Sequence, residues 1–359
     1  MFRFMQIIRL VVVSVALVLS AAAREGRIVR ETVHAVSLEN SVSKENPDRK
    51  VSIYLPPTYD SSPTGRYPVI YLLHGIGDTD ETWTTSWTRN NDGYWAIQNV
   101  MDKGIAEGKF GEMIVVMPDN KTNWFGSFYV NSSVTGNWDD FNSAELVRYI
   151  DTKYRTLNDP GHRGILGHSM GGFGALSLGM RHPDVFSVVY AMNPAIIDWG
   201  ADLTIASPAF SAILKARSFD ELLATKDLYT MATVTLGQAF SPNPNKPPFY
   251  VDLPFKMVEG KLEPDEPGFR RWRENSLIRM VDKYQGNLRK LRGLRFDSGY
   301  EDEFRFIPVN SRSLSIELTN YGVEHTFEEY NGDHRNRMWG RQGRLYSEIL
   351  PYLWEMLKN

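Results

Sequence analysis

Short apolar runs alternate with amphipathic stretches along the chain. The run from Tyr67 to Leu73 is apolar at nearly every position, which is typical of a strand buried on both faces of a parallel sheet. Pro56 and Pro57 end an earlier run, because proline has no N–H to donate to a strand ladder. The same criteria predict eight strands, at 29–36, 50–55, 67–73, 113–117, 164–166, 185–192, 294–296 and 325–330.

Helical periodicity separates several of these runs. Leu146, Ile150 and Tyr154 recur at four-residue spacing, which places them on one face of a helix. Strands that alternate with helices favour an α/β fold, with a doubly wound, mostly parallel sheet and helices on both faces. We therefore expect a single catalytic domain over residues 24–359. The predicted helices span 141–154, 171–180, 311–321 and 344–357.

The stretch 196–291 breaks this alternation. It contains no clear β-run, and Pro, Asn and Asp are frequent between Ser241 and Asp252. We interpret the stretch as a lid-like insertion that lies over the active site at the sheet edge. A separate helical domain is the alternative.

Composition and charge narrow the function classes. The net charge is −3, whereas nucleic-acid binders usually carry a basic excess, so no nucleic-acid partner is expected. The chain has no cysteine, which excludes disulfides, thiolate metal sites and cysteine nucleophiles. The 7 histidines have no metal-ligand spacing, so we expect no metal, although a calcium site built from carboxylates alone stays open.

The first 23 residues resemble a secretory signal peptide. Arg3 and Arg9 precede an apolar run from Leu10 to Leu19, and Ala21-Ala22-Ala23 fits the small-residue cleavage rule. We expect cleavage before Arg24, a secreted or periplasmic protein, and no stable membrane span in the mature chain. An uncleaved membrane anchor is the alternative, although the run is shorter than the ~20 residues that a span needs.

The segment Gly167-His168-Ser169-Met170-Gly171 contains a G-x-S-x-G pattern between a predicted strand and a predicted helix. In a nucleophile elbow, serine occupies a strained strand-to-helix turn, and small flanking residues allow the backbone to fold back. The pattern is weak alone, but this context makes Ser169 the predicted nucleophile. The N–H groups of Met170 and Ile76 are the predicted oxyanion-hole donors, since Ile76 follows the strand that ends at Leu73.

The order serine, acid, histidine in this type of fold limits the partners of Ser169. Only His325 and His334 lie far enough along the chain, and His334 falls in a loop after the last strand, where catalytic groups gather. The acid should follow the strand at 294–296. Four carboxylates compete there, and position alone selects none of them: Asp297, Glu301, Asp302 and Glu303.

Several motifs together resemble the esterase D-like family of α/β-hydrolases, which includes feruloyl and acetyl-xylan esterases, S-formylglutathione hydrolases and mycolyltransferases. The resemblance implies an α/β-hydrolase fold and an acid at the last place of a G-x-x-D pattern, which is Asp302 here. Two departures concern the substrate: Asp333 replaces a glycine found in carbohydrate-directed members, and the insertion after Pro194 is long. The matching segments are 72–75, 129–132, 167–172, 181–186, 299–302 and 332–334.

Taken together, these features predict an exported serine esterase that works through an acyl-enzyme and needs no cofactor. The resemblance, with tryptophans near the loops, favours short-chain or aromatic acyl esters of carbohydrates, as small molecules or oligosaccharides. Trp83 and Trp339 are the predicted substrate-binding residues, because indole rings stack on sugars or aromatic acyl groups; packing is the alternative for each. An acyltransferase of the mycolyltransferase type and a thioesterase like S-formylglutathione hydrolase are the alternative activities.

Overall fold

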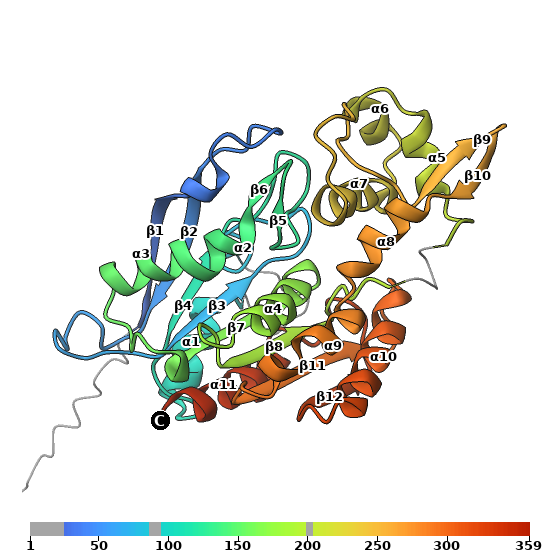
Figure 1. Cartoon of the computed structure of the whole chain (residues 1–359). Coiled ribbons are helices and arrows are strands. Elements are labelled where there is room, and N and C mark those ends of the chain that lie inside the picture. The colour runs from blue at the N-terminus through green and yellow to red at the C-terminus, as the bar shows by residue number, and fades with distance from the viewer. Residues whose placement is uncertain (1–24, 86–94, 199–203) are drawn as a thin grey trace, which may run out of the picture.

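The computed structural model describes residues 25–85, 95–198 and 204–359. They form an eight-stranded sheet with helices around it (Figure 1). The strand order is β1-β2-β4-β3-β7-β8-β11-β12, and only the β1–β2 and β2–β4 pairs are antiparallel. All eight predicted strands are confirmed, with ends that differ by a few residues. They are β1 (Arg27–His34), β2 (Asp48–Leu55), β3 (Val69–Leu73), β4 (Ile114–Pro118), β7 (Arg163–His168), β8 (Val188–Met192), β11 (Gly293–Gly299) and β12 (Thr326–Tyr330).

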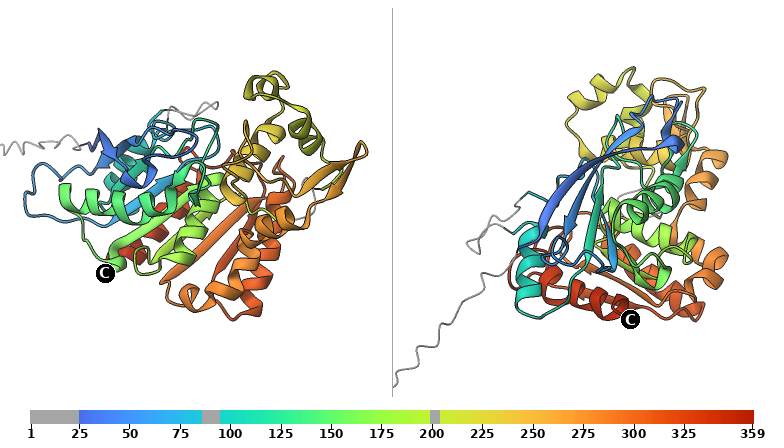
Figure 2. Two further views of the ribbon diagram at one scale, coloured as in Figure 1. Left: turned by 45° about the horizontal axis from the view of Figure 1, so that its top comes forward. Right: turned by 90° about the vertical axis from the view of Figure 1, so that its left-hand side faces the viewer.

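Helices cover both faces of the sheet, as predicted for a doubly wound arrangement (Figure 2). In β3, Val69, Tyr71 and Leu73 pack into one core, whereas Ile70 and Leu72 pack into the other, because successive side chains of a strand point to opposite faces. The first core is covered by α3 (Leu146–Lys153), α4 (Met170–Arg181), α9 (Leu277–Leu288) and α10 (Phe306–Asn320). The second is covered by α1 (Ile97–Ala106), η4 (Leu345–Ile349) and α11 (Leu350–Leu357).

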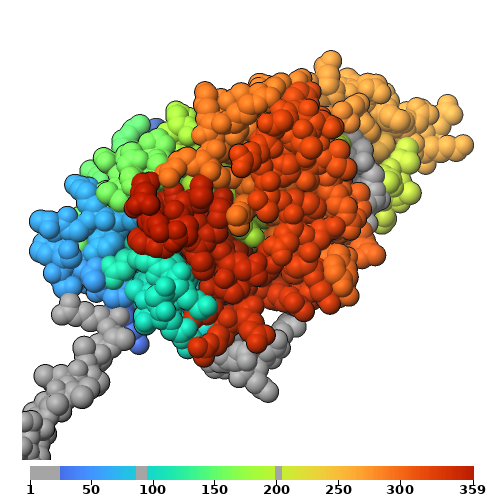
Figure 3. Space-filling view, turned by 90° about the horizontal axis from the view of Figure 1, so that it is seen from below, coloured from blue at the N-terminus to red at the C-terminus, as the bar shows by residue number. Residues whose placement is uncertain are grey.

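The underside of the molecule brings distant parts of the sequence together. Seen from below, the C-terminal segment in red lies beside the teal segment that contains α1 (Figure 3).

Outside the predicted insertion, the remaining elements are short and connect the main ones. They are η1 (Val36–Leu38), β5 (Asn131–Ser132), β6 (Gly136–Asn137), α2 (Trp138–Asp140), η2 (Phe141–Glu145) and η3 (Pro160–His162).

The predicted insertion at 196–291 divides into two parts. Its last helix, α9, packs against α4 and belongs to the layer that covers the sheet. The expectation of no β-structure is wrong, because a two-stranded hairpin lies before that helix. The part that projects beyond the sheet contains α5 (Pro208–Lys215), α6 (Phe219–Ala224), α7 (Leu228–Phe240), β9 (Phe255–Val258), β10 (Lys261–Pro264) and α8 (Glu266–Glu274) (Figure 1).

Two searches of the described residues are negative. No helix within them is both long enough and apolar enough to cross a membrane. In the same ranges, no three His, Asp or Glu side chains gather in a way that could hold a metal ion.

Candidate active site

Ser169 occupies the sharp turn between β7 and α4. Its backbone has φ 56° and ψ −117°, a strained conformation that non-glycine residues adopt mainly where function requires it. A Cβ on Gly167 would lie 2.0 Å from the Gly171 oxygen, and one on Gly171 would lie 2.3 Å from the Leu73 oxygen. Both flanking glycines are therefore needed for the turn to pack against β3, as the elbow pattern predicts.

Backbone hydrogen bonds hold the strained turn in place. The Ser169 N–H donates to the Met192 carbonyl at 3.0 Å, and the Ser169 carbonyl accepts from the Ala195 N–H at 2.9 Å. The Phe173 N–H donates to the same carbonyl at 3.0 Å as the first bond of the helix. The serine is thus fixed between the end of β8 and the start of α4.

His334 and Asp302 form a buried pair beside this turn. The imidazole Nδ1 lies 2.7 Å from Asp302 Oδ2, and the Phe304 N–H donates to Asp302 Oδ1 at 2.8 Å. Burial lowers the pKa of His334, because a charged imidazolium would lose its hydration there. Burial likewise raises the pKa of Asp302, and the Phe304 N–H acts in the opposite direction. The neutral imidazole, with Nδ1–H donated to the acid, has Nε2 available to accept a proton.

The sequence leaves four carboxylates as candidates for the acid, and their contacts in the structure distinguish them. Asp297 is fully buried in β11, where the Arg344 Nε donates to it at 3.1 Å and the Tyr190 hydroxyl donates at 2.9 Å. Within the part of the chain that the structure describes, Glu303 accepts only the His334 backbone N–H, at 3.3 Å. Of the four competing carboxylates, Asp302 is the one that contacts the His334 imidazole.

Two residues missed by the sequence analysis support the histidine loop. His168 Nε2 donates to the His334 carbonyl at 2.7 Å, since a carbonyl can only accept, and the two rings lie 4.6 Å apart. Asn193, with φ 40°, donates through Nδ2 to the same carbonyl at 3.3 Å, and its Oδ1 accepts the Gly299 N–H at 2.7 Å. His168 precedes the nucleophile, so it places His334 beside the elbow, while Asn193 links the loops of the acid and the base.

The predicted oxyanion donors lie together with the nucleophile. Ile76, Ser169 and Met170 all line one pocket, and a Cβ on Gly75 would lie 3.5 Å from the Ser169 Cβ. Within the described residues, neither the Ile76 N–H nor the Met170 N–H donates to another protein group. Both donors are therefore free to bind an oxygen at the nucleophile.

The pocket itself is almost entirely apolar. About 600 Å³ of empty space, part of it open to solvent, lies between its lining residues. Helix α7 of the insertion forms one wall, and the loops after β8 and β11 form others. The lining residues are Ile76, Phe128, Ser169, Met170, Ala195, Ile197, Leu228, Tyr229, Ala232, Thr233, Leu236, Phe304, Phe306 and Ile307.

The two predicted substrate-binding tryptophans are not among these lining residues. Trp83 is 3% exposed and packs in the second core, with its ring centroid 5.8 Å from that of Trp339. These contacts are those of packing residues, which was the alternative for both tryptophans. We therefore do not place Trp83 or Trp339 in the proposed site.

Comparisons with solved structures identify the fold. A ferulic acid esterase superposes with a TM-score of 0.63 at 24% identity, covering 93% of this chain and 99% of that one. An S-formylglutathione hydrolase from Agrobacterium tumefaciens superposes with a TM-score of 0.55 at 19% identity, covering 93% and 97% of the two chains. These likenesses confirm the α/β-hydrolase fold that the motifs imply.

Sequence relatives are similar over part of the chain. Esterase Rv1288 of Mycobacterium tuberculosis is 29% identical over 216 residues, which are 54% of this chain and 43% of that protein, so the chain spans less than half the relative's length. An endo-1,4-beta-xylanase/feruloyl esterase of Xylanibacter ruminicola is 32% identical over 138 residues, 38% of this chain and 18% of that protein. A family model described as "Putative esterase" matches residues 43–343. Since this match covers most of the chain, the protein belongs to that esterase family.

Proposed function

We propose that this protein hydrolyses carboxylic esters through a covalent acyl-serine intermediate. The observation that carries the proposal is that Ser169 on its strained elbow and the two N–H donors line one apolar pocket, while the buried His334–Asp302 pair lies next to them, in contact with His168 and with the pocket residue Phe304. Membership of the esterase family agrees with this chemistry.

The proposed reaction has two halves. The Ser169 Oγ attacks the ester carbonyl carbon while His334 Nε2 takes the Oγ proton, and the N–H groups of Ile76 and Met170 bind the oxyanion. The C–O bond then breaks, and His334 returns the proton to the departing alcohol. Water repeats the sequence on the acyl-enzyme, which releases the acid and restores the serine. Asp302 holds the imidazole in the tautomer that leaves Nε2 free.

The apolar pocket supports an acyl group without charge or many polar atoms. Only Ser169, Tyr229 and Thr233 among its lining residues carry a side-chain oxygen. A short aliphatic or aromatic acyl chain fits such a lining, because burying an unpaired polar group would cost free energy. An aromatic acyl half is supported by the feruloyl esterase names among the relatives, and a carbohydrate as the alcohol half by the xylanase name that one of them also carries.

Export is a further part of the proposal. The signal-peptide pattern at 1–23 lies outside the described residues, so its support is the sequence alone. An exported enzyme would meet polysaccharide esters, whereas S-formylglutathione is a cytosolic metabolite.

The direct test compares Ser169→Ala with Ser177→Ala. Both remove a serine hydroxyl at α4: Ser169 is its N-cap, and Ser177 lies in its second half, where the Oγ is buried with no hydrogen-bond partner among the described residues. Ser169→Ala should lower kcat for p-nitrophenyl acetate by ~10⁴–10⁶ with an unchanged melting temperature, because triad chemistry and not packing is lost. Ser177→Ala should keep activity.

Activity of Ser169→Ala within tenfold of wild type would refute the nucleophile. Release of free acid from acetylated and feruloylated oligosaccharides should accompany ester turnover in the wild type. If instead the acyl group passes mainly to an added sugar alcohol, the enzyme is an acyltransferase with the same triad.

A further inference from the structure

We propose that His74 is a positioning residue of the oxyanion hole, which orients and polarises the peptide unit whose N–H group belongs to Ile76. The inference rests on the proposed function, because it assigns a role to a residue that does not itself touch the substrate. The sequence analysis gave His74 no part in the reaction.

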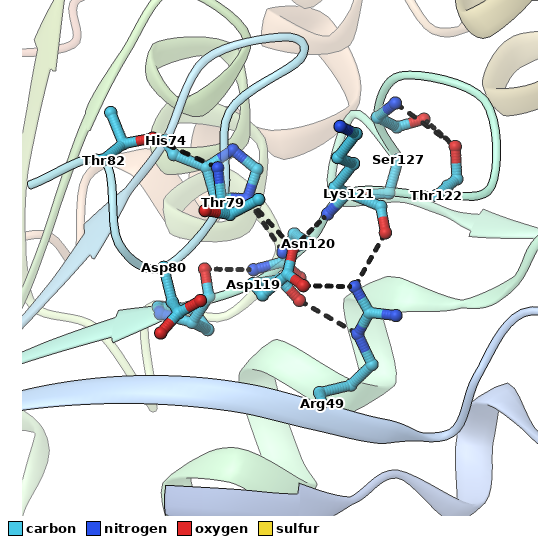
Figure 4. Close-up of polar contacts among 12 residues, drawn as sticks. Arg49, His74, Thr79, Asp80, Thr82, Asp119, Asn120, Lys121, Thr122 and Ser127 are labelled. Carbon is cyan, nitrogen blue, oxygen red and sulfur yellow. Dashed lines mark hydrogen bonds and ion pairs between the residues drawn. The ribbon is translucent and has the colours of Figure 1, made fainter. Parts of the chain in front are cut away.

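The two ring nitrogens of His74 have different partners, of which Figure 4 labels Asn120. The Asn120 N–H lies 2.8 Å from Nε2, and since a backbone N–H only donates, Nε2 must be the unprotonated nitrogen. The proton is then on Nδ1, which donates to the Gly75 carbonyl at 2.8 Å. His74 is fully buried, and burial lowers its pKa, which keeps the ring neutral and this tautomer in place.

The Gly75 carbonyl and the Ile76 N–H belong to the same planar peptide unit. Because that unit is rigid, a hydrogen bond that fixes the direction of its carbonyl also fixes the direction of its N–H. Donation to the carbonyl further polarises the unit and makes the N–H a stronger donor. At the other end of the loop, the Gly77 N–H is bound to the Phe125 carbonyl at 2.9 Å. The loop is thus held on both sides of Ile76, whose N–H stays free.

The group that binds Nε2 is itself held rigidly. Arg49 donates to the Asp119 carbonyl at 3.1 Å and to the Lys121 carbonyl at 2.7 Å, which fixes the backbone on both sides of Asn120 (Figure 4). The imidazole therefore has little freedom to rotate, and its orientation is transmitted to the oxyanion loop.

Two substitutions separate the two ring contacts. His74→Asn places an amide N–H near the position of Nδ1, so the bond to the Gly75 carbonyl can persist while the bond to Asn120 is lost. His74→Gln places an amide oxygen near Nε2, so the bond to Asn120 can persist while the bond to Gly75 is lost. If the role of His74 is purely structural, the activity of each variant should fall in step with its melting temperature. Our proposal predicts instead that His74→Asn, which can keep the bond to Gly75, stays active and that His74→Gln, which loses this bond, does not.

The measurement is kcat for an ester and for its thiono analogue, in which sulfur replaces the carbonyl oxygen and accepts hydrogen bonds weakly. The ester-to-thionoester ratio reports on the oxyanion hole and does not depend on the fraction of folded enzyme, so it remains usable if a variant folds poorly. We expect His74→Gln to lower kcat about 10- to 100-fold and to reduce the ratio, with KM nearly unchanged, since the loss of one oxyanion donor costs ~10²–10³. His74→Asn should keep kcat and the ester-to-thionoester ratio within about threefold of the wild-type values.

Tyr129→Phe is the matched control, because it removes a bond to the His74 backbone and leaves both ring contacts intact. It should lower the melting temperature without changing the ratio. A wild-type ratio in His74→Gln would overturn the inference. If His74→Gln has the wild-type ratio while Ser169→Ala is inactive in the same assay, only the role of His74 is refuted. An active Ser169→Ala would overturn the proposed function itself.

Discussion

Three residues with a strained backbone conformation lie at the proposed site. Ser169, Asn193 and Phe128 all have positive φ without being glycine. Ser169 is the proposed nucleophile, Asn193 links the loops of the proposed acid and base, and Phe128 lines the pocket. Backbone strain of this kind costs of order 1–3 kcal/mol per residue and persists only where surrounding contacts enforce it. The hydrogen bonds of Ser169 and Asn193 to neighbouring loops are such contacts.

Replacement of the acids should separate catalysis from stability. Asp302→Asn can no longer hold the imidazole in its working tautomer, so kcat should fall strongly, by ~10⁴ as the equivalent change does in a serine protease. Asp297→Asn should leave kcat within about tenfold and lower the melting temperature instead. Breaking a buried ion pair costs roughly 3–5 kcal/mol, and less here because Arg344 also binds Glu328 and Glu348. Steady-state rates and thermal melts of both variants test this.

If Asp297→Asn were the inactive variant while Asp302→Asn kept its rate, the acid would be wrongly assigned. Glu301→Gln serves as a control for loop charge, because Glu301 is exposed and should change neither quantity.

The pH dependence of kcat/KM should report the buried histidine. Burial lowers the pKa of His334 from its ordinary value of 6.5, with Glu303 and Asp333 acting against the shift and Arg335 adding to it. As pH falls through the lowered pKa, the imidazole takes up a proton and can no longer accept one from the serine. Activity should therefore be lost as the pH falls, with a midpoint below pH 6.5. A midpoint at or above that value would contradict the burial argument.

At this scale the sequence identifies some residues and not others, for a physical reason. Ser169 and His334 follow from local motifs and chain order, and Asp302 needed the family resemblance, because four acids share one loop. His74 is held by a hydrogen bond to a group 46 positions away, and Asn193 donates to a group 141 positions away. No local pattern marks such contacts, which exist only after the loops have come together.

Elements were predictable where burial leaves a pattern in the sequence. The inner strands, such as β3 and β8, are buried at every position, so their apolar runs were recognised. The hairpin of β9 and β10 is exposed at most positions and carries no such run, which explains why it was missed. Helix α1 was also missed: its N-cap is Ala96, which has no polar side chain to mark a helix start.

Helix α7 should set the size of the acyl group. Ala232 lines the pocket on this helix, so Ala232→Phe would place a ring in the space of the acyl chain. We expect kcat/KM to fall more than tenfold for butyryl and feruloyl esters and to stay within about threefold for acetyl esters, in line with the cost of misfit in apolar pockets. The measurement is kcat/KM over a series of acyl esters of increasing size.

Ala224→Phe is the control, because it adds the same ring on the exposed end of α6, which does not line the pocket. Equal losses for all esters in Ala232→Phe would indicate a general disturbance of the site. A rate that rises steadily into long acyl chains in the wild type would argue for a lipase.

At the scale of the whole molecule, a large catalytic body and a projecting insertion share one site. The sheet carries the nucleophile, acid and histidine, whereas α7 supplies five pocket residues (Leu228, Tyr229, Ala232, Thr233 and Leu236). The insertion also exposes large apolar side chains, among them Leu214, Leu223 and Met257.

The N-terminal end of the fold leads to the last prediction, that export removes residues 1–23 without loss of stability. The Gly26 N–H donates to Asp102 Oδ1 at 2.8 Å, and β1 pairs with β2 from Arg27 onward, so the fold is anchored immediately after the expected cleavage site. Signal cleavage requires small residues at the first and third positions before the cut, which are Ala23 and Ala21. Protein recovered from an exporting host should therefore begin at Arg24 and melt at the same temperature as a chain expressed from that residue. Ala23→Leu should block processing, while Ala22→Leu, at the unrestricted middle position, should not. A full-length wild-type chain retained in membranes would refute the signal peptide and favour the membrane anchor.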